Sequence, residues 1–183
     1  MNEKENLIKI LKDGGVAVMP TDTIYGLVGS ALNKLTVERI YGIRQREENR
    51  PCIILIGDIE ELGRFNINLS DVQKLEIQKH WPGSVSIIFD CPDDSLEYLH
   101  RGTKTLAFRL PKSRDLGQLL KETGPLTAPS ANITGQPNAK NVQEAREYFD
   151  NSVDFYLDGG EMLGKASKIL RLHKNGSVSI LRE

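Results

Sequence analysis

Apolar residues along the chain follow two spacings, and each spacing predicts a different element. Between residues 7 and 11 they recur at helical spacing, and Gly14-Gly15 then supplies the left-handed backbone at which helices commonly end. A continuous apolar run over residues 16–19 follows directly, and short runs of this kind are typical of buried strands. We therefore expect a helix that leads into a buried strand.

A second continuous apolar run covers residues 51–56 and indicates a central strand that is covered on both faces. The same criteria predict helices that begin at Asn33 or Thr36, at Ser70, at Ser113 and at Asn141, and strands over residues 84–90, 105–110, 126–128, 153–157, 168–172 and 178–181. Strands and helices alternate irregularly. The predicted fold class is α/β, with a twisted sheet of mixed parallel and antiparallel strands and flanking helices.

A polar stretch follows the first predicted strand. Pro20 ends regular strand pairing because it has no N–H to donate, and Gly26 permits a further close turn. Between them, Thr21, Asp22, Thr23 and Tyr25 place two hydroxyls, a carboxylate and a phenol within five residues. We expect this stretch to be a loop that contacts a ligand, and an ordinary capped turn is the alternative.

Length and charge limit the class of protein. With 183 residues we expect one domain over residues 1–183, and the formal charge of −1 excludes a global positive field for long nucleic acids. Cys52 and Cys91 form no C-x-x-C pair, which favours a reducing compartment, and no apolar run is long enough to span a membrane. We therefore expect a cytoplasmic protein. We also expect no dedicated metal site, because the three histidines are scattered along the chain.

Residues 44–50 form a local basic cluster in the order Arg-Gln-Arg-Glu-Glu-Asn-Arg. Guanidinium groups make planar bidentate contacts with phosphate and stay charged, so Arg44 and Arg46 are candidates for a phosphate site. The alternative is a solvated helix end, where basic residues favour the negative end of the helix dipole.

Two further stretches carry candidate binding residues. Residues 127–135 combine small residues and hydroxyls after a predicted strand, and Ser130 and Asn132 offer both donors and acceptors. The alternative is an elaborate turn in which Asn132 acts as an Asx-type cap. In the predicted strand at 105–110, Thr105 and Arg109 lie on one face by the two-residue period, so an apolar strand presents a guanidinium. Such a charge is either paired in a salt bridge or bound to a ligand. Because Ser130 has no obvious histidine partner, a serine nucleophile is disfavoured.

Taken together, these stretches resemble the YrdC family, whose short, single-domain members synthesise threonylcarbamoyl-AMP for the tRNA modification threonylcarbamoyladenosine. The resemblance is carried by residues 20–27 (PTDTIYGL), 81–83 (WPG), 107–111 (AFRLP), 129–137 (PSANITGQP), 158–160 (DGG) and 180–182 (ILR). It implies a YrdC-like fold with a large concave basic cleft. It also implies ATP, L-threonine and bicarbonate as substrates, Mg²⁺ that is carried with ATP, and the tRNA-modification machinery as a partner.

The resemblance also assigns roles to residues. L-threonine binding is implied for Thr21, Arg109, Ser130 and Ser167, and ATP binding for Arg44, Arg46, Thr105, Ser130, Asn132, Asn138 and Arg182. Arg44, Arg46, Ser130 and Asn132 are the implied catalytic residues. Arg44 and Arg46 fall at the family's Lys-x-Arg pair, which meets the triphosphate.

Two departures from the family pattern leave other functions open. Arg44 stands where the family usually has lysine, and Lys168 and Arg171 replace a hydroxyl and a carboxylate. The chain is therefore either a tolerant synthase or a drifted paralogue that binds a nucleotide without full synthase activity. A module that binds double-stranded RNA or tRNA without catalysis is a third hypothesis. Longer members of the family add a C-terminal domain, which we do not expect here.

Overall fold

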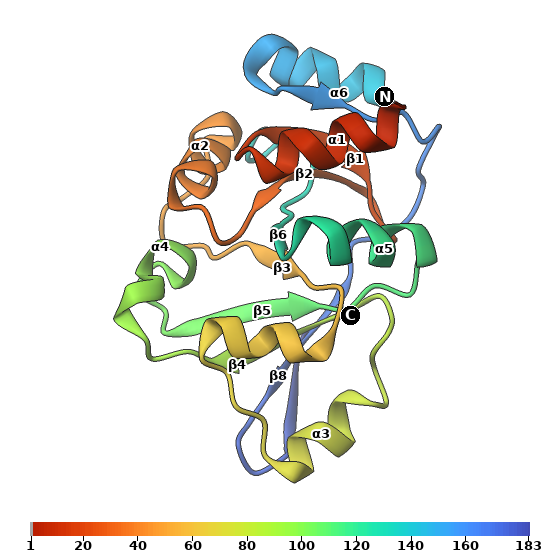
Figure 1. Ribbon diagram of the computed structural model, residues 1–183. Helices are drawn as coiled ribbons and strands as arrows, with labels where there is room; N and C mark the ends of the chain where they lie inside the picture. Colours follow the sequence, from red (N-terminus) through yellow and green to blue (C-terminus); the bar gives the residue numbers. More distant parts are fainter. Residues whose placement is uncertain (1) are drawn as a thin grey trace.

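The structure is a computed structural model that describes residues 2–183, and its strands form one sheet (Figure 1). In sheet order the strands are β7 (Phe155–Tyr156), β1 (Val16–Pro20), β2 (Tyr25–Ser30), β6 (Leu126–Thr127), β3 (Ile53–Leu55), β5 (Thr105–Arg109), β4 (Val85–Asp90), β8 (Lys168–Leu172) and β9 (Val178–Arg182). The pairs β1–β7, β3–β5 and β4–β8 are parallel and the other pairs are antiparallel. The predicted mixed α/β sheet is thus confirmed.

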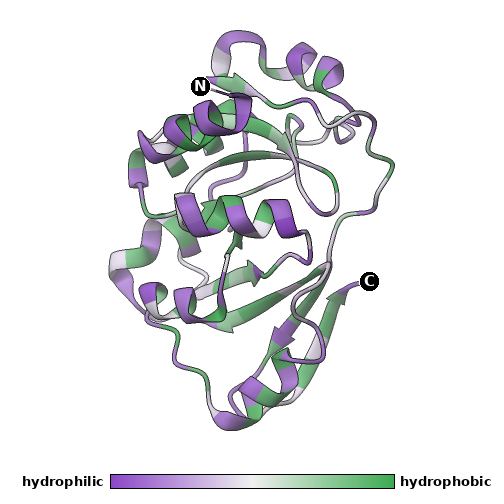
Figure 2. Cartoon of the chain, turned by 45° about the vertical axis from the view of Figure 1, so that its right-hand side comes forward, coloured by the Kyte–Doolittle hydropathy of each residue, from purple (hydrophilic) through white to green (hydrophobic). Residues whose placement is uncertain are grey.

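Helices lie on both faces of this sheet. They are α1 (Glu3–Lys12), α2 (Lys34–Arg44), α3 (Asp71–Ile77), α4 (Glu97–His100), α5 (Arg114–Thr123) and α6 (Val142–Phe149), with the 3₁₀ helices η1 (Ile59–Phe65), η2 (Asp94–Leu96) and η3 (Asp150–Ser152). The predicted caps are present, and Asn33 rather than Thr36 begins α2, because the Asn33 side chain accepts from the Thr36 N–H at 3.2 Å. Polar and apolar bands alternate along the helices (Figure 2), as expected for elements that bury one face.

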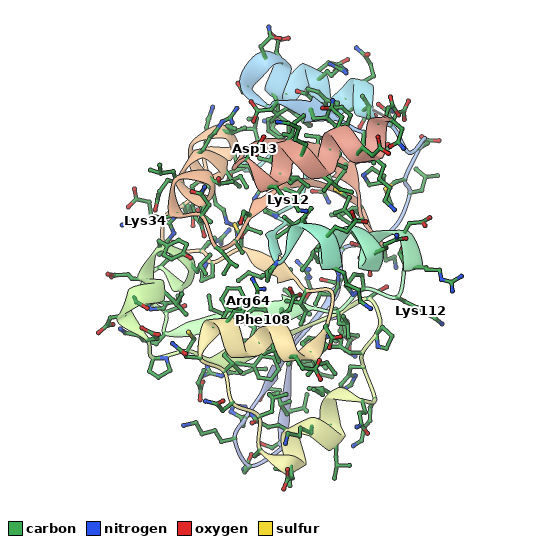
Figure 3. All side chains as sticks on the ribbon, in the orientation of Figure 1. Lys12, Asp13, Lys34, Arg64, Phe108 and Lys112 are labelled. Carbon is green, nitrogen blue, oxygen red and sulfur yellow. The ribbon has the colours of Figure 1, made fainter. Side chains whose placement is uncertain are left out.

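Strand β1 shows how the sheet separates two layers of core. Ala17 and Met19 pack with α1 and α5, whereas Val16 and Val18 pack with side chains of α2 and α6. This follows from the two-residue period of a strand, since successive side chains point to opposite faces. A third cluster centres on Phe108 of β5, which lies beside η1 (Figure 3). Its ring meets that of Phe65 edge-on at a centroid distance of 5.0 Å.

The sequence did not predict strand β2, because its glycines and the preceding polar residues are typical of a loop. The turn that precedes β2 is closed by Thr21, whose hydroxyl donates to the Ile24 carbonyl at 2.7 Å. Pro20 is still paired with Tyr25, so the strand continues up to the turn. Gly29 is required by packing, because a Cβ there would lie 2.5 Å from the Thr36 methyl group of α2. The helices η1, η2 and α4 were not predicted either.

Residues 158–167 connect β7 near one edge of the sheet to β8 near the other (Figure 1). We call this connection the strap. The Tyr25 hydroxyl donates to the Gly160 carbonyl at 2.9 Å and accepts from the Gly159 N–H at 2.8 Å. These two bonds tie the strap to the start of β2.

Candidate active site

A cavity of about 350 Å³ lies where the β1–β2 turn, β5, the end of the strap and β9 meet. Eight of the ten residues that the sequence singled out line it, although they come from distant parts of the chain. They are Thr21, Arg46, Thr105, Arg109, Ser130, Asn138, Ser167 and Arg182. The remaining two, Arg44 and Asn132, lie behind the cavity wall. The volume falls in the range of small-molecule sites.

Strand β5 forms the floor of the cavity in the way its spacing predicts. Thr105, Ala107 and Arg109 line the cavity. Leu106 and Phe108, which alternate with them, are buried in the core on the opposite face. The prediction that one face of this strand presents a guanidinium is therefore confirmed.

Arg109 is both paired and part of the cavity wall. Its Nη2 and Nε lie 2.9 and 3.1 Å from Asp22 Oδ1, and the two side chains are only 4% and 7% exposed. Burial lowers the pKa of Arg109, while the Asp22 carboxylate opposes that shift. Its Nη1 has no hydrogen-bond partner within residues 2–183. A salt bridge and a ligand contact were the two alternatives for Arg109. The geometry permits both, because Nε and Nη2 pair with Asp22 while the residue still lines the cavity.

Asp22 adjoins the site through Arg109, although it was not among the predicted binding residues. It lies in the predicted polar stretch, but only the fold brings it from the β1–β2 turn to the end of β5. Its second oxygen, Oδ2, is buried without a partner in the described part of the chain. No sequence spacing relates Asp22 to Arg109, because 87 residues separate them.

Arg44 and Asn132 bond to each other instead of lining the cavity. Arg44 Nε donates to the Asn132 carbonyl and Nη2 to Asn132 Oδ1, both at 2.9 Å. Nη2 also donates to Ser130 Oγ at 3.2 Å. The predicted direct contact of Arg44 with a triphosphate does not match this placement, because the guanidinium is turned into the wall and is buried.

Arg46 reaches the cavity, although two of its nitrogens are held by the backbone. Its Nε donates to the Arg50 carbonyl at 2.8 Å and its Nη2 to the Pro51 carbonyl at 3.0 Å. These bonds fold the segment after α2 back on itself, so that Arg46 forms part of the wall. A plain solvated helix end, the alternative for this stretch, therefore does not describe Arg46.

Ser167 and Arg182 form the opposite side of the cavity. Arg182 donates to the Ser167 carbonyl through Nε at 3.0 Å and through Nη2 at 2.7 Å. The Ser167 hydroxyl lies 2.8 Å from that of Ser86 on β4. Lys168 and Arg171, which depart from the family pattern, do not line this cavity, and Arg171 pairs with Asp90 at 2.9 Å.

Arginine is the charged residue type in the described part of the cavity wall. Arg46, Arg109 and Arg182 line it, and no aspartate or glutamate is among the described residues that do. Burial lowers the pKa of Arg182 as it does that of Arg109. Positive side chains in a partly enclosed site raise the local concentration of anions, although the chain as a whole carries −1.

Residues 2–183 contain no group of three or more His, Cys, Asp and Glu side chains that could hold a metal ion. In the same residues, every helix is too short or too polar to cross a lipid bilayer. Both cysteines are unpaired and buried, and Cys52 lies in the cavity wall.

Comparison with known proteins identifies similar chains. The Sua5/YciO/YrdC family model, described as "Telomere recombination", matches residues 9–183. The chain is 31% identical to threonylcarbamoyl-AMP synthase of Bacillus subtilis over 164 residues, which cover 88% of this chain and 47% of that protein. It is 28% identical to threonylcarbamoyl-AMP synthase of Idiomarina loihiensis over 161 residues, which cover 86% of each.

A solved structure supports the same relationship. Pyrococcus abyssi Sua5, complexed with L-threonine, matches with a TM-score of 0.87 and 26% identity over 98% of this chain and 53% of that one. The chain therefore spans about half the length of the Bacillus and Pyrococcus proteins.

Proposed function

The chain belongs to the Sua5/YciO/YrdC family, and we propose that it is an L-threonylcarbamoyladenylate synthase. This enzyme, a nucleotidyltransferase, forms threonylcarbamoyl-AMP and pyrophosphate from L-threonine, bicarbonate and ATP for tRNA threonylcarbamoyladenosine modification. One observation carries the proposal: a single cavity joins a buried arginine at the end of β5 to two further arginines, with hydroxyl groups between them. Such a wall suits two substrates that each carry an anionic group, the carboxylate of L-threonine and the phosphates of ATP.

On this proposal Arg109 binds the carboxylate of L-threonine. Asp22 holds two of its nitrogens, which leaves Nη1 for the substrate, and Thr21 adjoins the guanidinium at 3.5 Å from Nη2. Arg46 and Arg182, together with Thr105 and Asn138, receive ATP, and Ser130 lies between the two substrates. Ser167 completes the threonine side.

The reaction needs no protein nucleophile. The threonine amine attacks bicarbonate and water leaves, which gives a carbamate; a carbamate oxygen then attacks the α-phosphorus, and pyrophosphate departs with the bonding electrons. Ser130 is held by Asn132 and Arg44, and no histidine lies among the described residues of the wall. Positioning and neutralisation of charge are therefore what the residues of the wall supply.

Mg²⁺ enters with ATP as part of the substrate in this proposal. The hydroxyl and guanidinium groups of the wall suit phosphate oxygens and leave the ion to the phosphates and water. We also propose a cytoplasmic location, which fits the unpaired buried cysteines, and a partner in the tRNA-modification machinery that accepts the adenylate.

A pyrophosphate assay tests the proposal. Purified protein with ATP, Mg²⁺, bicarbonate and L-threonine is expected to release pyrophosphate, and omission of threonine is expected to abolish the release. Arg109→Ala is expected to weaken threonine binding more than ATP binding, whereas Arg114→Ala, which changes an exposed arginine of α5, serves as the control. Release that does not depend on threonine contradicts the proposal.

A drifted paralogue that binds a nucleotide without making the adenylate is the second candidate. The placement of Arg44 in the wall favours it, because the residue at the family's lysine position does not face the cavity. ATP binding without threonine-dependent release of pyrophosphate is the result that this candidate predicts. A basic wall also suits RNA phosphate, so binding of double-stranded RNA or tRNA should be measured at several salt concentrations.

A further inference from the structure

Arg44 is a buried cation without a counter-ion. It is 4% exposed, and no carboxylate of residues 2–183 lies within 4.0 Å of its guanidinium. Its Nη1 is buried without any hydrogen-bond partner in the same part of the chain. Burying an unpaired charge is costly, so a side chain in this position needs a compensating role.

The hydrogen bonds of Arg44 all go to one loop. Nε and Nη2 grip the carbonyl and side-chain oxygens of Asn132, and Nη2 also reaches Ser130 Oγ. The Thr134 N–H donates back to the Arg44 carbonyl at 2.9 Å. The end of α2 and residues 130–134 are therefore clamped by both side chain and backbone.

Ser130 is the point where this clamp meets the cavity. Its hydroxyl donates to Asn132 Oδ1 at 2.7 Å, the same oxygen that accepts from Arg44. The Asn132 amide nitrogen is used within the loop, at the carbonyls of Ile133 and Gln136. Asn132 is thus held at both its oxygen and its nitrogen, and the hydroxyl of Ser130, which lines the cavity, is held by Asn132 and Arg44.

We infer that Arg44 is a positioning residue, which fixes the Ser130 hydroxyl through Asn132 and does not itself contact phosphate. The effect on turnover rests on the proposed function, whereas the clamp itself does not. The guanidinium presents donors from separate nitrogens in one plane, which matches the three acceptors, whereas a lysine ammonium presents all its donors from one nitrogen. Direct contact with the triphosphate then falls to Arg46, which lines the cavity.

Steady-state kinetics separate positioning from phosphate contact. Arg44→Met is expected to lower kcat about 100-fold with little change in the KM for ATP, since misplacement of a group in the site costs about that much. Arg46→Met is expected to raise the KM for ATP about tenfold instead. Arg44→Lys, which restores the family's usual residue, is expected to be as impaired as Arg44→Met.

A double-mutant cycle tests whether Arg44 acts through Ser130. In a Ser130→Ala background, Arg44→Met is expected to cost less than about tenfold in kcat, because the group it positions is already gone. If the losses in kcat of the two single variants multiply in the double variant, the inference is overturned. A gain of activity in Arg44→Lys overturns it too, and so does an Arg44→Met variant in which the KM for ATP rises while kcat is unchanged.

Hydrogen exchange tests the clamp in the absence of substrates. Arg44→Met is expected to increase amide exchange over residues 129–136 at least about tenfold, while Arg114→Met leaves it unchanged. Unchanged exchange in Arg44→Met overturns the inference whatever the activity. If wild-type protein releases no pyrophosphate but the exchange increases, the proposed function fails and the clamp stands.

Discussion

At the scale of single residues, the buried Asp22–Arg109 pair holds a guanidinium in the cavity wall. Both side chains are almost fully buried, and the aspartate fixes the orientation of the guanidinium. Breaking a buried pair from one side leaves an uncompensated charge, whereas removing both charges does not. The two partners therefore depend on each other for stability, apart from any role in binding.

We expect Arg109→Met to lower the free energy of unfolding by about 3–5 kcal/mol, because it leaves the Asp22 carboxylate buried and unpaired. Adding Asp22→Asn to this variant is expected to recover most of the loss. Urea unfolding of the two variants and of the wild type measures both effects.

The control for this prediction is the exposed Arg171–Asp90 pair, whose side chains are 41% and 44% exposed. Arg171→Met is expected to change stability by about 1 kcal/mol or less. A loss in Arg109→Met as small as that of the control would contradict a tightly coupled buried pair.

At the scale of elements, the strap depends on close contact with the β1–β2 turn. A Cβ at Gly164 would lie 2.1 Å from the Thr23 carbonyl oxygen, which is backbone and cannot move aside. Thr23 lines the cavity, and Ala166 and Ser167 of the strap do so too. The contact between the strap and the β1–β2 turn therefore also sets the shape of the cavity.

Gly164→Ala is therefore expected to displace the strap and to weaken threonine binding about tenfold, since the wall of the site moves. Titration calorimetry with L-threonine measures the affinity, and limited proteolysis over residues 158–166 reports the displacement. Gly117→Ala in α5 is the matched control.

Nothing lies within 4 Å of a Cβ at Gly117, so its replacement by alanine is expected to stabilise the protein by about 0.5–1 kcal/mol. If Gly164→Ala binds threonine as tightly as Gly117→Ala, the strap does not shape the site.

At the scale of the whole molecule, Asp154 joins three parts of one half of the fold. Its carboxylate accepts from the Val16 N–H at the start of β1 and from Arg39 of α2, and it precedes β7 in the chain. The hydrogen bond from Arg39 is the largest cause of its lowered pKa. Stability linked to a lowered carboxyl pKa is present above the ordinary value of about 3.9 and is lost as the pH falls through the folded value.

Asp154→Asn is accordingly expected to cost about 1 kcal/mol or less at pH 7, since the side chains of the Arg39–Asp154 pair are 38% and 37% exposed and water screens it. The difference from wild type should shrink below about pH 4 and vanish once both forms are neutral. Chemical unfolding at a series of pH values measures it. A difference that stays constant down to pH 2 would contradict the linkage.

The sequence by itself determined the periodic and chemical features of this protein. Helix caps, the one-sided face of β5 and most strands follow from local spacing and turn chemistry, which neighbouring residues alone decide. The motifs also carried the family resemblance and eight of the residues that line the cavity. Strand β2 escaped prediction because glycines in a sequence are typical of turns, whereas Gly29 of β2 is required by packing against α2.

Only the tertiary structure decided which of these residues meet. The pairing of Asp22 with Arg109 and the clamp of Arg44 on Asn132 join positions 87 and 88 residues apart, and no local pattern encodes such contacts. The direction of each side chain is also decided by the tertiary structure. Arg44 and Arg46 belong to one motif, yet Arg44 is turned into the wall and Arg46 lines the cavity. Charge and spacing identify candidate groups, but burial and long-range hydrogen bonds decide what each group is free to bind.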